Sequence, residues 1–188
     1  MTVNSSATVI VGGGFVGLFT ALHLRHRQHS DPIILIDPQS RFVFKPMLYE
    51  LLTEELPESV VSPSYEELLV NSDIDHWQEA VTGIDLPHRR VTLASGRQQV
   101  YENLVLGVGA VQGYLGTEGA EHNAFAFRSR QEAIALKRHL QACLRQSLET
   151  EDAAKRQALL TVAIVGAGPA GVEMAATLAD LLPSWYLS

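Results

Sequence analysis

The chain has 188 residues, of which 46% are hydrophobic and 19% charged, with a formal net charge of −7 at pH 7. Such a composition is globular, and the length corresponds to one domain, or one domain and part of another. Nucleic-acid binding is not expected, because phosphate contact requires dense positive charge and the Lys and Arg residues are not clustered. The single cysteine, Cys143, excludes a disulfide framework and fits a reducing compartment.

The N-terminal segment predicts the beginning of a parallel sheet. Residues 7–11 predict an apolar strand, residues 15–28 have helical spacing with an apolar inner face, and residues 32–37 predict a second strand. Neither strand alternates polar with apolar residues, which is typical of parallel strands that are covered on both faces.

The middle of the chain predicts short helices and then a meander of strands. Short helices are expected within residues 44–57 and 62–72, the second capped by Ser62 or Ser64. The strands are expected at residues 74–85, 89–95 and 98–110, with hairpin-like breaks at 86–88 and 95–96.

The last part of the chain predicts a long helical stretch and a repeat of the opening unit. Residues 129–160 are strongly helical, and Ser129 and Glu132 have the spacing of a capping box. Residues 161–166 predict a strand, which with the helix after it repeats the strand–glycine–helix unit near the N-terminus.

The first glycine motif has the spacing of a dinucleotide-binding turn. Gly12, Gly14 and Gly17 follow a predicted strand and open a predicted helix, where they permit a tight turn, close approach of a pyrophosphate and close helix–strand packing. Asp37 ends the next strand, 20 residues after Gly17, at the spacing of a carboxylate that binds a ribose hydroxyl.

The second glycine motif repeats this pattern near the end of the chain. Gly166, Gly168 and Gly171 follow residues 161–166, and the same spacing of 20 residues places the ribose-binding acid near position 191, past Ser188. The sequence therefore predicts a second nucleotide-binding domain that is truncated after its first strand and helix.

Two such motifs in one chain are typical of flavoproteins with an FAD domain and an NAD(P)H domain, and this sequence resembles the type II NADH dehydrogenases. These are single-subunit NADH:quinone oxidoreductases. Gly107-Val108-Gly109 departs from the family's Ala-Thr-Gly. The resemblance covers nearly the whole chain and rests on four stretches: VIVGGGFVGL, ILIDPQSRFVFKPMLYELLTEEL, YENLVLGVGA and VAIVGAGPAGVEMAATLADL.

The resemblance implies a set of site residues. Glu173 corresponds to the family's glutamate near the contact between nicotinamide and flavin, and we expect it to be the catalytic residue. Gly166, Gly168 and Gly171 correspond to the NADH turn. The residues implied to bind FAD are Gly12, Gly14, Phe15 and Gly17 at the pyrophosphate, Asp37 at the adenosine ribose, Lys45 and Pro46 at the isoalloxazine, Val81 at the adenine and Gly109 along the flavin cleft.

The expected fold is α/β, with a Rossmann-like FAD-binding domain that contains a parallel sheet and a β-meander, plus the first βα unit of a second Rossmann domain. We expect the FAD-binding domain at residues 1–120, a helical connection at 121–160 and the start of the NAD(P)H-binding domain at 161–188. The resemblance implies electron transfer from NADH through FAD to a quinone, with the isolated chain a poor catalyst. The alternative is a non-catalytic nucleotide-binding remnant, or a fragment of another two-nucleotide flavoprotein.

The remaining expectations concern location, partners and metals. No basic leader segment is found, and no apolar run reaches the length of about 18 residues needed to span a membrane, so a cytoplasmic location is expected. The resemblance implies peripheral membrane contact only through a segment outside this chain, and it leaves homo-oligomerisation open. His23, His26 and His29 share a helix face without metal-ligand spacing, so no metal site is expected. One cysteine cannot supply a redox pair, which disfavours disulfide reductase chemistry.

Overall fold

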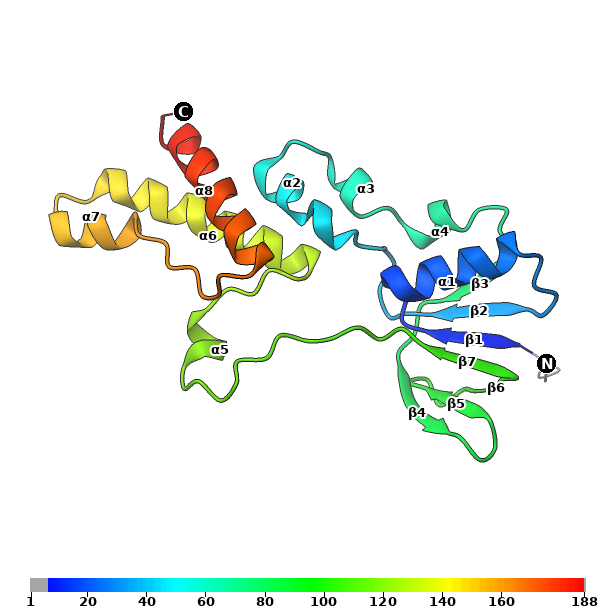
Figure 1. Ribbon diagram of the computed structural model, residues 1–188. Helices are drawn as coiled ribbons and strands as arrows, with labels where there is room; N and C mark the ends of the chain where they lie inside the picture. The colour runs from blue at the N-terminus through cyan, green and yellow to red at the C-terminus, as the bar shows by residue number, and fades with distance from the viewer. Residues whose placement is uncertain (1–6, 188) are drawn as a thin grey trace. The chain divides into compact units, whose positions relative to one another are not determined.

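The computed structural model describes residues 7–187, which form two compact units (Figure 1). The first unit comprises the chain up to Phe44 together with Ser62–Val111, and the second comprises Lys45–Val61 together with Gln112–Ser188. The expected domain boundaries near residues 120 and 160 stay a prediction, because compact units are defined by contacts and domains by independent folding.

The first unit is built on a four-stranded parallel sheet, as the apolar strands predict. Its strands stand in the order β3-β2-β1-β7. Every residue of β1 and β2 is buried, as parallel strands covered on both faces require. The strands are β1 (Thr8–Val11), β2 (Ile33–Ile36), β3 (Ile74–Trp77) and β7 (Asn103–Leu106).

Each face of this sheet is covered by a different element. Helix α1 (Phe15–His26) covers one face through Leu18 and Ala21, which pack in one cluster with Ile10 and Leu35 (Figure 1). On the other face a three-stranded antiparallel sheet contributes buried side chains of β5 to a second cluster. That sheet has the order β4-β5-β6 and consists of β4 (Val81–Asp85), β5 (Arg90–Leu93) and β6 (Gln98–Val100).

Two of the predicted strands are divided in the structure. Residues 74–85 form β3 of the parallel sheet and β4 of the antiparallel sheet, because the chain turns at Trp77, whose carbonyl accepts from the N–H of Glu79 at 2.9 Å. Residues 98–110 likewise divide into β6 and β7, and β7 ends at Leu106. These segments mix apolar with polar residues, and their sequence does not show which sheet each one joins.

The second unit is helical. Its helices are a 3-10 turn (Lys45–Met47), α2 (Leu48–Thr53), α3 (Glu58–Val61), α5 (Ala120–Asn123), α6 (Arg130–Glu149), α7 (Ala153–Leu159) and α8 (Pro169–Leu187). Its core is formed by Leu52, Leu140 and three residues of α8, namely Met174, Leu178 and Leu181.

Helix α4 (Tyr65–Leu68) belongs to the first unit, and Ser64, rather than Ser62, is its cap.

The predicted helical stretch 129–160 is two helices. Helix α6 ends at Glu149, and Asp152 begins α7 by accepting from the N–H groups of Ala154 and Lys155 at 2.9 and 3.1 Å. An aspartate that accepts from N–H groups in this way takes the donors that a continuous helix would bond to backbone carbonyls, so a new helix begins at this point.

The expected strand at 161–166 is not part of a sheet. Residues 161–167 have no regular secondary structure, and Val162 and Ile164 are 40% and 39% exposed. A strand is stable only beside another strand, and no neighbour for this segment lies among the described residues. This segment therefore exposes apolar side chains.

We predict that Ser129→Ala lowers the free energy of unfolding of the chain by about 1 kcal/mol. The Ser129 hydroxyl accepts from the N–H of Glu132 at 3.2 Å, and the Glu132 carboxylate accepts from the N–H of Ser129 at 2.8 Å. Denaturant unfolding followed by circular dichroism measures the loss. Gln131→Ala, an exposed position in the same turn, is the matched control, and equal stability of the two variants would contradict the prediction.

Candidate dinucleotide-binding site

The first and third glycines of the N-terminal turn are required by the fold itself. Gly12 has a φ of +96°, and a Cβ on it would lie 2.5 Å from the carbonyl oxygen of Gly107. A Cβ on Gly17 would lie 1.7 Å from the carbonyl oxygen of Gly12. Both contacts are with backbone atoms that cannot move aside, so any side chain at these positions would displace β1, β7 or α1.

The middle glycine has no such reason to be glycine. Gly14 has a φ of −61° and a ψ of −169°, which any residue adopts, and a Cβ on it would meet nothing within 4 Å. The first helical hydrogen bond of α1 runs from the N–H of Leu18 to the carbonyl of Gly14, at 2.9 Å. The N–H groups before Leu18 therefore have no partner within the helix, and they carry the positive end of the helix dipole beside the open space at Gly14.

Asp37 lies directly beside this turn. Its Oδ2 accepts from the N–H of Gly13 at 2.6 Å, and its Oδ1 accepts from the N–H of Gln39 at 2.8 Å. The carboxyl end of β2 places the side chain there, since β1 and β2 are parallel and in register. The structure therefore brings the predicted acid and the predicted glycine turn together.

Two further residues of the site were not predicted from the sequence. Tyr65, only 2% exposed, donates its hydroxyl to the carbonyl of Gly13 at 2.8 Å, and its ring lies against His76 with centroids 4.3 Å apart. Burial, and then the charge of Asp37, raises the pKa of Tyr65 well above its usual range. Burial lowers the pKa of His76, although Asp37 opposes this shift. The available signal was the extra glycine at position 13, which the G-x-G-x-x-G pattern does not need.

The other residues assigned to FAD lie in less defined surroundings. Phe15 opens α1, is 58% exposed and stacks on Phe19 at 4.4 Å. Val81 begins β4 and packs with the cluster on the far face of the sheet from α1. Gly109, with a φ of +69°, follows β7 in an irregular segment, and Lys45 and Pro46 form the 3-10 turn of the second unit. The roles of these residues stay predictions.

The second glycine turn has the same local geometry as the first. Gly166 has a φ of +107°, and a Cβ on Gly171 would lie 2.0 Å from the Gly166 carbonyl oxygen. A Cβ on Gly168 would meet nothing, and the N–H of Val172 donates to the Gly168 carbonyl at 3.1 Å. Glycine spacing thus forms this turn even though residues 161–166 have no sheet to join.

Tyr49 contacts the first turns of α8 within the second unit. Its hydroxyl donates to the carbonyl of Ala170 at 3.0 Å. Burial raises the pKa of Tyr49, and the charge and hydrogen bonding of Glu173 raise it further. Glu173 is exposed on α8 near this hydroxyl, and its catalytic role is untested.

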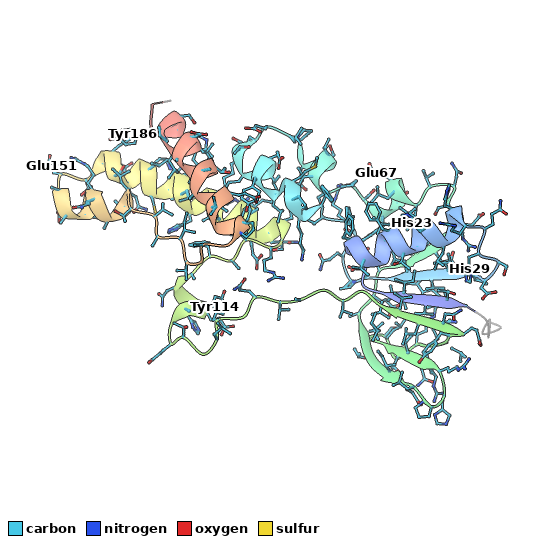
Figure 2. The ribbon with its side chains drawn as sticks, viewed as in Figure 1. His23, His29, Glu67, Tyr114, Glu151 and Tyr186 are labelled. Carbon is cyan, nitrogen blue, oxygen red and sulfur yellow. The ribbon has the colours of Figure 1, made fainter. Side chains whose placement is uncertain are left out.

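The expectation that His23, His26 and His29 share a helix face is wrong, because α1 ends at His26 and His29 lies beyond it. His23 and His29 take part in ordinary hydrogen bonds. The ring of His23 bonds the Phe19 carbonyl at 2.8 Å, and the ring of His29 bonds the Thr8 hydroxyl at 2.9 Å. Figure 2 labels His23 on α1 and His29 beyond the end of this helix. No three His, Cys, Asp or Glu side chains within residues 7–187 lie where they could share a metal ion. No helix in the described part of the chain is long and apolar enough to cross a bilayer.

A parallel sheet whose first strand leads through a glycine turn into a helix, with an acid at the end of the second strand, defines a dinucleotide-binding protein of the Rossmann type. The chain belongs to the pyridine nucleotide-disulphide oxidoreductase family, whose model matches residues 6–184. The expected α/β fold class is thereby confirmed.

Individual relatives confirm the resemblance to type II NADH dehydrogenases. The chain is 39% identical to the demethylphylloquinone reductase NdbB of Synechocystis, over 97% of this chain and 45% of that one. It is 33% identical to the type II NADH:quinone oxidoreductase Ndh of Mycobacterium tuberculosis, over 92% and 38%. The structure of NDH2 from Plasmodium falciparum has the same fold, with a TM-score of 0.85 at 22% identity over 95% and 37%. The chain spans less than half the length of these relatives.

We predict that Gly17→Ala destabilises the chain by about 1–3 kcal/mol, because the new methyl group overlaps backbone. Gly14→Ala should cost under about 1 kcal/mol, because its methyl group meets open space and only an N-cap is altered. Thermal unfolding of the two variants measures the difference. Equal losses would show that the turn is not packed as described.

Proposed function

We propose that the chain is the N-terminal part of an FAD-dependent NADH:quinone oxidoreductase and that its first unit binds the adenosine diphosphate portion of FAD. The observation that carries the proposal is Gly14, a glycine that the protein's own packing does not require. A glycine with open space beside unpaired N–H groups at a helix start fits a pyrophosphate that must approach the backbone closely.

The residues around this space fit the two ends of an adenosine diphosphate group. The N–H groups at the start of α1 would bind the phosphates, and their positive dipole favours that charge. The Asp37 carboxylate already accepts two backbone hydrogen bonds, and its remaining lone pairs are available to a ribose hydroxyl. In the second turn, Gly166 has a positive φ, Gly168 borders open space and Gly171 packs against the Gly166 carbonyl. These features support NADH binding at that turn.

The relatives support the choice of reaction. The Synechocystis relative is named as a demethylphylloquinone reductase, and the Mycobacterium tuberculosis relative as an NADH:quinone oxidoreductase. When bound, FAD supplies the hydride acceptance from NADH and the electron delivery to a quinone. The protein's part is to bind, orient and exclude water. Glu173 would then lie near the nicotinamide, and membrane contact, a peripheral cytoplasmic location and self-association would be properties of the longer protein.

The alternative is a nucleotide-binding chain without catalysis. The observation that favours it is the unpaired apolar segment at 161–166, which leaves the second turn on an incomplete support. Flavin binding and reduction by NADH separate the two functions, because a remnant can retain the first without the second.

We predict that the purified chain binds FAD and that Gly14→Leu lowers the bound flavin at least about tenfold, because the side chain fills the space of the pyrophosphate. Flavin absorbance and equilibrium titration with FAD measure the change. Gly83→Leu is the control, since a Cβ at Gly83 makes only ordinary contact, at 3.9 Å with Thr92. Flavin content of Gly14→Leu equal to that of the parent would refute the FAD site.

We predict that the 188-residue chain reconstituted with FAD is reduced slowly by NADH. The acid expected near position 191 is not part of it, and each lost charge-assisted hydrogen bond costs roughly 1.5–3 kcal/mol, or about ten- to hundredfold in affinity. Stopped-flow absorbance during NADH titration measures the rate, with light scattering to report particle mass. Complete reduction by dithionite is the control, and rapid bleaching of a stable monomer by NADH would contradict the prediction.

A further inference from the structure

Tyr65 is held in place from three sides within the first unit. Its N–H donates to the carbonyl of Ser40 at 3.1 Å, and Ser64 before it caps α4 in a capping box with Glu67, which Figure 2 shows on that helix. Its ring packs on His76 of β3. A side chain fixed in this way loses little further freedom when its hydroxyl makes a hydrogen bond.

The hydroxyl of Tyr65 and the carboxylate of Asp37 together hold both polar groups of Gly13. Tyr65 donates to the Gly13 carbonyl at 2.8 Å, while the Gly13 N–H donates to Asp37 at 2.6 Å. A Cβ on Gly13 would lie 2.2 Å from the Tyr65 oxygen, so the extra glycine of the motif leaves room for this hydroxyl. Burial and the Asp37 charge raise the pKa of Tyr65, which keeps the hydroxyl protonated and therefore a donor.

The direction of the Gly13 carbonyl decides the direction of the next N–H. The carbonyl of Gly13 and the N–H of Gly14 belong to one planar trans peptide, so they point in opposite directions. With the carbonyl held by Tyr65, the N–H of Gly14 points away from the Tyr65 hydroxyl. That N–H has no acceptor among the described residues, and Gly14 borders open space.

We propose that Tyr65 is a positioning residue for the phosphates of the bound dinucleotide: its hydroxyl fixes the Gly13–Gly14 peptide so that the Gly14 N–H is presented to the pyrophosphate. The inference rests on the proposed FAD site. It assigns a role to a residue far from the glycine motif in sequence, which acts through the backbone and does not itself touch the ligand.

The test compares Tyr65→Phe, which keeps the ring and removes the hydroxyl, with Tyr101→Phe. Tyr101 is also buried in the first unit, but in the cluster on the far face of the sheet from α1. Titration with FAD should give a Kd about tenfold higher for Tyr65→Phe, because the hydrogen bond from the Gly14 N–H to the charged pyrophosphate is lost. The Kd of Tyr101→Phe should be unchanged. The ³¹P resonances of the bound pyrophosphate should shift in Tyr65→Phe alone, which a general loss of stability would not cause.

A second measurement needs no variant at position 65. In the unaltered chain, the amide proton resonance of Gly14 should move downfield when FAD is added, and that of Gly13, already bonded to Asp37, should move less. A Gly14 resonance that does not move would overturn the inference, even if Tyr65→Phe does not fold. A folded Tyr65→Phe with the parent's Kd and ³¹P spectrum would also overturn it and leave the proposed function intact, whereas a parent chain that binds no FAD would overturn both.

Discussion

The close approach of three backbone segments at Gly12, Gly17 and Gly107 is the constraint on which the first unit depends. A Cβ at Gly107 would lie only 3.1 Å from the N of Gly17 and 3.3 Å from the carbonyl oxygen of Gly12. The N–H of Gly107 donates to Val11 at 2.8 Å, so β7 pairs with β1 right up to the turn. The family that the sequence resembles has alanine at position 107. Glycine here avoids the close contacts that a Cβ would make at this junction. The junction sets the start of α1 against the end of the sheet, where the candidate site lies.

The glycines of the turn divide by the reason for their presence. At the third position, Gly17 and Gly171 relieve close contacts with the backbone of the same turn. At the first position, Gly12 and Gly166 adopt a positive φ that side-chain-bearing residues rarely take. The middle glycines of both turns relieve no contact in the described structure. Both middle glycines stand beside open space at the start of a helix, which fits the close approach of dinucleotide phosphates.

Much of the fold and part of the site could be predicted from local sequence. The strand–glycine–helix unit near the N-terminus, the position of Asp37 directly after β2 and the capping box of Ser129 and Glu132 depend on residues close in the chain, and all were found where expected. The division of residues 74–85 between two sheets could not be predicted, because both halves mix apolar with polar residues and only the partner strands distinguish them. Tyr65 was missed because its partner Gly13 lies 52 residues away.

The sequence by itself determined the class of the protein, since a glycine turn is specified by the φ angles and close contacts that only glycine permits, and it forms in the second unit even without a sheet. Tertiary structure alone decided which residues surround that turn. The loop at Ser40, the cap at Ser64 and the stacking on His76 together bring the Tyr65 hydroxyl to Gly13, and no local pattern encodes that convergence. The segment at 161–166 shows the same division: its residues have the composition of a strand, but a strand exists only through hydrogen bonds to a neighbour.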